Sequence, residues 1–332
     1  MDESMIWLIV LMLVFGLFFI IKGSDWATES LAPVARRLGT TYIFVGVIIV
    51  SFMISLPEII VAIYTTLAGR VEIAFGVIIG SIVCNIGLMV GLSAMIKPLK
   101  VPTSLIIRDG IFAVCVAVLV YVLSIDNKIT RAEGFAFLLI FIPYIINAWL
   151  QEKNKQKQEK RMELKEIQFE LRVAGFRLGE MNAGLSSFFF GMFLLLLGSY
   201  LFSHSLIEIA NLSGLPDLLI GLTIGAIGPS MPNIAAAIQA TRKNMGDVAV
   251  AETLGSDIFT LLITLGLLSI LSPIMLTDRM LAFDIPMMVL FSFFLLFFMI
   301  GDKRTITRAK GTALFIGYIA LIAINIAISG TR

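Results

Sequence analysis

Charged and metal-binding residue types are scarce in this sequence. Only 14% of its 332 residues are Asp, Glu, Lys or Arg, whereas soluble domains carry about 25%. One histidine and two cysteines exclude a zinc or copper centre built from several imidazole or thiolate ligands. The net charge of +2 favours neither a nucleic acid nor a strongly acidic partner. Hydrophobic residues make up 58% of the chain, more than one globular core can bury, so we expect lipid around much of it.

The apolar residues gather in long runs. A helix that spans a membrane needs about 17–25 mostly apolar residues. The sequence offers ten such runs, at residues 5–21, 42–67, 73–96, 105–125, 134–150, 181–202, 218–241, 248–276, 285–300 and 311–329. A long polar segment, residues 151–180, separates the fifth run from the sixth. We therefore predict an all-α membrane protein with ten transmembrane helices.

The two halves of the chain repeat each other at a constant offset of 175 residues. Glycine, serine and proline match in register, as in the pairs Gly23/Gly198, Ser55/Ser230, Pro57/Pro232, Gly80/Gly255 and Pro98/Pro273. Each copy holds five runs, an odd number, so the second copy must enter the membrane upside down. Inverted repeats of this kind are typical of secondary transporters, whose substrate site lies between the copies. We predict a first five-helix repeat at residues 1–150, a linker at 151–180 and a second, inverted repeat at 181–332.

Lys and Arg residues are distributed unevenly over the two sides of the predicted bundle. With the N-terminus outside, most of the 25 fall on the inner side, including all those of the polar segment. The outer side keeps Arg70, Lys128, Arg131, Arg279 and Arg332. Because positive charge is retained on the cytoplasmic side, we expect a multi-pass protein of the cell membrane with both termini outside and the linker in the cytoplasm.

The strongest candidate site surrounds Glu58, near the middle of the second run. A carboxylate at that depth is costly unless it meets a cation, a proton or a structural partner on a neighbouring helix. Pro57 and its repeat counterpart Pro232 each remove a helical hydrogen bond. We expect both helices to kink or break there and to expose carbonyl oxygens to a cavity.

Polar side chains from four runs complete this candidate site. Ser81 and Asn85 are four residues apart, so they share a helical face. Ser256 and Thr260 have the same spacing in the second repeat. The full set offers oxygen ligands, which hard cations such as Na⁺ and Ca²⁺ prefer. It consists of Glu58, Ser55, Ser81, Asn85, Ser230, Asn233, Ser256 and Thr260. The Gly-Ser steps alone have a simpler reading, because small residues let helices pack closely.

The chain resembles the calcium:cation antiporter superfamily, particularly its prokaryotic sodium/calcium exchangers. The inverted repeat, the motif Ser55-Leu-Pro-Glu58 and the segment Gly23-Ser-Asp-Trp26 carry this resemblance over nearly the whole chain. The family hallmark is Gly-Thr-Ser-x-Pro-Glu in both repeats, followed by Gly-Ser-x-x-x-Asn or -Asp. The resemblance implies that Glu58 binds the cation. It also implies polar ligands at Ser55, Ser81, Asn85, Ser230 and Ser256, and main-chain ligands at Ser51, Ile54 and Ala226.

The second repeat departs from this hallmark. Asn233 stands where the family has its second glutamate, and Thr260 stands where many members carry an aspartate. One remaining carboxylate leaves a bound Ca²⁺ uncompensated by one charge. Glu252 and Asp257 are the two residues that could restore the missing charge. Glu252 shares a helical face with Ser256 and is expected near the cation path. Asp257 lies about 100° further around the helix and is expected to face away.

We expect a secondary-active antiporter that exchanges Ca²⁺ or a related cation for Na⁺ or H⁺ by alternating access, without enzymatic activity or a cofactor. A monovalent cation/proton exchanger is the main alternative, because the site keeps few carboxylates and a proton on Glu58 could replace a coupling ion. A cation channel and an intramembrane hydrolase that pairs Glu58 with Asp257 come behind it. Expected partners are the lipid bilayer and small inorganic cations, with no nucleic acid and a monomeric functional unit. Asp25, beyond the first run, is expected to be solvated, on either a continued first helix or a surface helix over residues 25–37.

Overall fold

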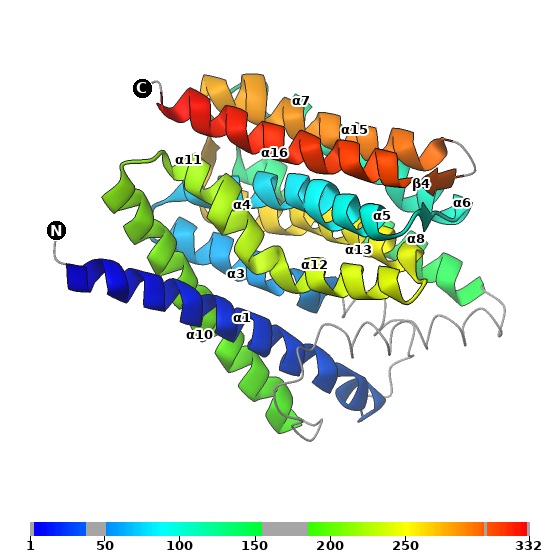
Figure 1. The fold of residues 1–332 in the computed structure, drawn as a ribbon, viewed down its shortest axis with the longest axis horizontal. Helices are drawn as coiled ribbons and strands as arrows, with labels where there is room; N and C mark the ends of the chain where they lie inside the picture. The colour runs from blue at the N-terminus through cyan, green and yellow to red at the C-terminus, as the bar shows by residue number, and fades with distance from the viewer. Residues whose placement is uncertain (1–2, 38–50, 155–184, 302–303, 331–332) are drawn as a thin grey trace.

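The computed structural model describes residues 3–37, 51–154, 185–301 and 304–330, which form a bundle of long helices (Figure 1). The elements before the linker are α1 (Glu3–Arg37), α3 (Ser51–Leu67), α4 (Val71–Cys84), η2 (Asn85–Val90), α5 (Gly91–Ile96), β1 (Leu99–Lys100), α6 (Thr103–Leu105), η3 (Ile106–Gly110), α7 (Ile111–Leu123), β2 (Lys128–Ile129) and α8 (Arg131–Asn154). Those after it are α10 (Leu185–Ser213), α11 (Asp217–Ile220), η4 (Gly221–Gly225), α12 (Ala226–Arg242), α13 (Gly246–Phe259), η5 (Thr260–Thr264), α14 (Leu265–Leu271), β3 (Ile274–Met275), η6 (Met280–Asp284), α15 (Ile285–Ile300), β4 (Thr305–Ile306) and α16 (Arg308–Gly330).

The membrane-spanning helices agree with the ten-helix prediction. Nine helices in the described part are long and apolar enough to cross a bilayer, and a shorter apolar helix at residues 55–67 belongs to the remaining predicted run, the second, at residues 42–67. Residues 42–50 of that run lie outside the described residues, as do residues 155–180 of the predicted linker. Four strands of two residues each were not expected.

The inverted repeat is visible in the backbone. α3 and α12 have matching bounds at the sequence offset of 175 residues, and so do α4 and α13. The turns that precede α4 and α13 contain equivalent left-handed residues, Gly69 with φ 79° and Asn244 with φ 69°. β1 pairs with β4, and β3 pairs with β2, so each repeat contributes a strand to the other in the same way.

α1 and α10 form a closely crossed pair at one edge of the bundle (Figure 1). Glycines lie where the two backbones meet. A Cβ atom at Gly23 would lie 2.4 Å from the Leu195 amide nitrogen, and one at Gly191 would lie 2.5 Å from the Ala27 amide nitrogen. Only glycine therefore permits this approach.

The first helix extends well beyond its apolar run. α1 continues to Arg37, so residues 25–37 prolong this helix and do not form a separate one. Asp25 is 2% exposed, and its Oδ2 atom lies 3.7 Å from the Lys22 Nζ atom. The prediction of a solvated Asp25 is wrong, because α1 packs against α10 beyond the end of its apolar stretch.

α4 and its continuation lie at the centre of the bundle. In the most apolar stretch of residues 71–96, 94% is buried inside the protein. In the most apolar stretch of residues 4–27, which belong to α1, the buried share is 17%. α4 packs directly on η4, where a Cβ atom at Gly221 would lie 2.3 Å from the Ile73 carbonyl oxygen. α4 and α13 can therefore place polar groups away from lipid.

Candidate functional site

Four helices bring the candidate residues of both repeats together. Glu58 on α3 is 1% exposed, and its Oε1 atom accepts a hydrogen bond of 3.1 Å from the Ser230 hydroxyl on α12. The Ser55 and Ser256 hydroxyl oxygens, on α3 and α13, lie 3.4 Å apart. These contacts join the repeats, as the prediction of a site between them requires.

Asp257 belongs to the same polar network. The Asn85 side-chain amide donates a hydrogen bond of 3.1 Å to Asp257 Oδ1 and lies 3.5 Å from the Ser256 hydroxyl. Asp257 is 3% exposed, so the prediction that it faces away from the centre is wrong. Its neighbours on α13 are buried on several sides of the helix, and a rotation of about 100° from Ser256 therefore leads to another packed surface rather than to lipid.

Several buried oxygen atoms of this network receive no hydrogen bond from the part of the chain that the structure describes. They are Glu58 Oε2, Asn85 Oδ1 and Thr260 Oγ1. A buried oxygen without a donor is unfavourable, and a hard cation is a suitable partner for it. The donor set therefore fits a cation as substrate.

Two kinds of buried carboxylate occur in the spans. Asp109 and Asp284 hold equivalent positions in the repeats and each faces an arginine, with separations of 2.6 Å to Arg108 Nη2 and 3.8 Å to Arg279 Nε. Glu58 and Asp257 form no ion pair with any described Lys, Arg or His. The structural ion pair that was the alternative reading of Glu58 is therefore absent from the described residues.

The helices at the site run through their prolines. α3 contains Pro57, α12 contains Pro229 and Pro232, and neither helix is interrupted there. Of the kink or break expected at these prolines, the break does not occur, and the kink stays a prediction. π-helical turns, which are frequent at functional sites, lie instead directly before α12 and directly after α4 and α13.

The remaining predicted ligands take several positions. Ser81 is fully buried and donates its hydroxyl to the Val77 carbonyl of its own helix. Asn233 is 2% exposed on α12. Glu252 is partly exposed, one turn before Ser256.

The predicted main-chain ligands lie at the starts of two helices. Ser51 begins α3 and Ile54 lies in its first turn, with side chains outside the described part. Ala226 is fully buried and begins α12. The roles of these carbonyl oxygens stay predictions.

Asp257 is the residue whose place in the network the sequence reasoning missed. Its signal was available, because an ionisable residue inside an apolar run is by default a functional candidate. The expectation that Asp257 faces away from the centre, taken from its angle of about 100° to Ser256, concealed it.

Comparison with known proteins gives consistent matches. The sequence model described as sodium/calcium exchanger protein matches residues 8–150 and 183–327. The sodium/calcium exchanger MaX1 of Methanosarcina acetivorans is 29% identical, over 95% of this chain and 97% of the relative. The putative antiporter CaxA of Alkalimonas amylolytica is 32% identical, over 91% of this chain and 95% of the relative. A structure of the sodium-calcium exchanger NCX_Mj superimposes with a TM-score of 0.62 at 25% identity, over 98% of this chain and 99% of that one.

Proposed function

The chain belongs to the sodium/calcium exchanger family of membrane cation antiporters, and on this premise we propose that it exchanges Ca²⁺ for Na⁺ through the site around Glu58. The observation that carries the choice of a divalent ion is the second buried carboxylate, Asp257, which Asn85 joins to the site. With Glu58 alone, a bound Ca²⁺ would leave one positive charge uncompensated in a medium of low dielectric constant. Two carboxylates together balance the two positive charges of the bound Ca²⁺.

The oxygen atoms around these carboxylates suffice for calcium. Ca²⁺ takes about 6–8 oxygen ligands. The Asn85 amide group donates its N–H to Asp257 Oδ1. The Asn85 Oδ1 atom is then left for the ion. Further candidates are the hydroxyl groups of Ser55, Ser230, Ser256 and Thr260 and the carbonyl groups of Ser51, Ile54 and Ala226.

Exchange follows from competition for shared ligands. An ion that occupies the carboxylates excludes its competitor, so the affinities for the two ions are coupled. An empty site holds two uncompensated charges in the membrane, and this cost opposes the transition without an ion. α1 and α10, held together by their glycine-lined contact, then slide as a pair against the other helices and expose the site to each side in turn. No chemical step and no cofactor is needed, and the functional unit is a monomer.

The orientation of the chain is also part of this proposal. Both termini lie outside and residues 151–180 lie in the cytoplasm, as the positive-inside rule favours. Cysteine accessibility at Lys128 and at Lys310, which the proposal places on opposite sides, tests it. Labelling of both positions from the same side of sealed vesicles contradicts the orientation.

An ion-panel flux assay in sealed liposomes tests the proposed function. We expect saturable Ca²⁺ uptake that requires an outward Na⁺ gradient. Proton-coupled Na⁺ or K⁺ flux without Ca²⁺ uptake would instead favour a monovalent exchanger, which the absence of carboxylates at Asn233 and Thr260 makes the second candidate. Uptake that needs no counter-ion indicates a channel. Absence of flux for every ion contradicts transport and leaves the intramembrane hydrolase.

A further inference from the structure

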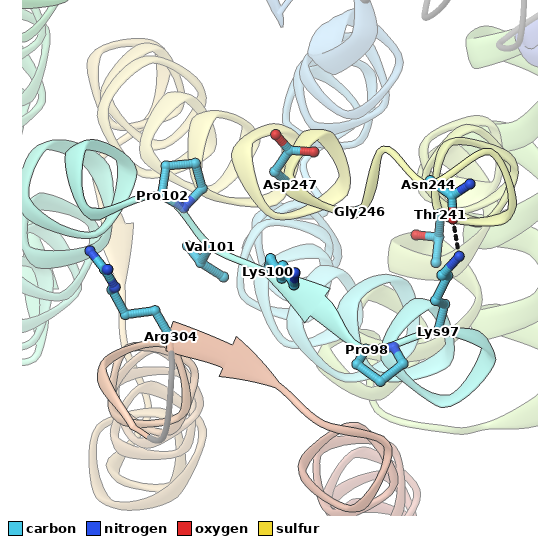
Figure 2. Close-up of a pocket in the computed structure, with 10 residues that line it drawn as sticks. All are labelled: Lys97, Pro98, Lys100, Val101, Pro102, Thr241, Asn244, Gly246, Asp247 and Arg304. Carbon is cyan, nitrogen blue, oxygen red and sulfur yellow. Dashed lines mark hydrogen bonds between the residues drawn. The ribbon is translucent and has the colours of Figure 1, made fainter.

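A pocket with several charged residues in its lining lies at one end of the bundle, apart from the Glu58 site (Figure 2). It has a volume of about 620 Å³. Its walls come from the loop after α5, the C-terminus of α12, the start of α13 and the loop before β4, and thus from both repeats. None of the residues around Glu58 lines it.

Positive charge dominates this pocket. Lys97, Lys100 and Arg304 line it together with one carboxylate, that of Asp247. The Lys97 ammonium donates a hydrogen bond to the Asn244 side chain (Figure 2). Lys100 and Arg304 are exposed and form no ion pair with any other residue that the structure describes. Among the described residues, these two cationic side chains therefore have no anionic partner.

The backbone fixes these two cations at neighbouring positions. Lys100 ends β1 and is paired with Thr305 of β4, the residue after Arg304. The Val101 amide donates a hydrogen bond of 2.9 Å to the Arg304 carbonyl oxygen. The strand pairing therefore holds the backbones of these two residues near each other, while their exposed side chains extend from it in different directions, that of Arg304 towards Pro102 (Figure 2).

Thr241 provides an independent observation at the wall of the same pocket. Its side chain is 1% exposed, and its hydroxyl oxygen has no hydrogen-bond partner among the described residues. Figure 2 shows this oxygen directed into the hollow. An unsatisfied buried hydroxyl is costly, and an anion oxygen would accept a hydrogen bond from it. The 14-residue helix α13 begins beside it at Gly246, with the positive end of its dipole towards the pocket.

We propose that this pocket binds a phosphate group, with Lys100 and Arg304 as its charge partners and Thr241 as a hydrogen-bond donor. The group belongs either to an anionic lipid headgroup or to a soluble phosphate compound. The pocket lies on the side that the basic residues predict to be cytoplasmic, where anionic lipids gather. The proposal does not depend on the identity of the transported ions.

Binding to the purified full-length protein tests it. Native mass spectrometry with dioleoylphosphatidic acid and with dioleoylphosphatidylcholine covers the lipid source, and calorimetry with pyrophosphate covers the soluble source. The test variant is K100Q/R304Q. The control is K128Q/R131Q, which removes two exposed charges beside the other two-stranded sheet. T241V removes the hydroxyl and keeps every charge.

We expect one saturable phosphate site. K100Q/R304Q weakens it by at least about tenfold, since charge-assisted hydrogen bonds are lost, and T241V weakens it about threefold. The control changes affinity less than about twofold. Selective binding of phosphatidic acid identifies the lipid source, and binding of pyrophosphate identifies the soluble one. Equal losses in test and control variants, or no saturable binding of either probe, overturn the proposal. If K100Q/R304Q does not fold, an unchanged affinity of T241V overturns it.

Discussion

The two repeats share a backbone but differ in charge at the site. α3 carries Glu58, whereas the equivalent residue on α12 is Asn233. In the other pair of equivalent helices, α4 and α13, the second repeat carries the acidic residue instead. α13 has Asp257 where α4 has Ile82. Each repeat thus supplies one carboxylate, from helices that are not equivalent. Under the proposed function, the symmetric scaffold therefore carries asymmetric ligands, and Asp257 supplies the charge that position 233 lacks.

The largest effect is expected from neutralising the first-repeat carboxylate. E58Q keeps the shape of the side chain and removes its charge. Loss of one member of a buried charge pair costs about 3–5 kcal/mol, so Na⁺-driven Ca²⁺ uptake in liposomes should fall by at least about 100-fold. E72Q, an exposed residue in the first turn of α4, is the matched control and should transport normally. Undiminished flux in folded E58Q refutes the site.

The second-repeat carboxylate should follow with a smaller loss. D257N removes the negative charge of the carboxylate that the Asn85 amide positions by a hydrogen bond. We expect Ca²⁺ affinity to fall by about tenfold or more, equivalent to about 1.4 kcal/mol, and Na⁺ affinity to fall less, because a divalent ion depends more on charge. Calorimetric titration with both ions measures this. Equal losses for Ca²⁺ and Na⁺ would argue against a charge-balancing role.

Moving the carboxylate tests whether its position matters. The double variant D257N/T260D moves the acidic group to residue 260, where many sodium/calcium exchangers carry an aspartate. Both residues are buried, Asp257 near the end of α13 and Thr260 at the start of η5, which continues that helix, so Ca²⁺ affinity should recover to within about threefold of the starting protein, well under 1.4 kcal/mol. An affinity as low as that of D257N alone would mean that residue 260 does not reach the ion.

Two serines at equivalent positions of the repeats, Ser256 and Ser81, are expected to differ in effect, and S81A should have the smallest effect of all. Ser256 contacts Ser55 of the other repeat, whereas Ser81 donates its hydroxyl within its own helix. S256A should weaken Ca²⁺ binding about fivefold, since a hydrogen bond or ligand contact contributes about 1 kcal/mol. S81A should change it less than about twofold. The reverse order would show that the first repeat supplies the hydroxyl ligand.

The sequence predicts the fold well because its signals are strong and local. Apolar runs locate the helices, and glycines such as Gly23 and Gly198 match in register because the backbones touch there. The two-residue strands carry no such signal, because they depend on pairing between distant segments such as β1 and β4. Of the predicted site residues, Glu58 contacts Ser230 and Ser55 contacts Ser256, so the sequence placed these side chains from both repeats together correctly.

Side-chain direction was harder to predict on elements that are buried on all sides. Asp257 was misjudged because helical spacing gives an angle around the axis but does not tell which neighbour lies at that angle. Asp25 was misjudged for a related reason, since the end of an apolar run does not mark the end of helix packing. Thr241 gave no signal, because a threonine at a helix end is ordinary in sequence.

The location of bound Ca²⁺ tests the central claim that Glu58 and Asp257 serve one ion. Anomalous diffraction from crystals of the protein grown with Ca²⁺ measures it directly. The account predicts one peak between the two side chains, at the usual calcium–oxygen distance of about 2.3–2.6 Å from a carboxylate oxygen of each. A peak that contacts Glu58 while Asp257 remains remote from the ion, or a peak that contacts neither residue, would contradict it.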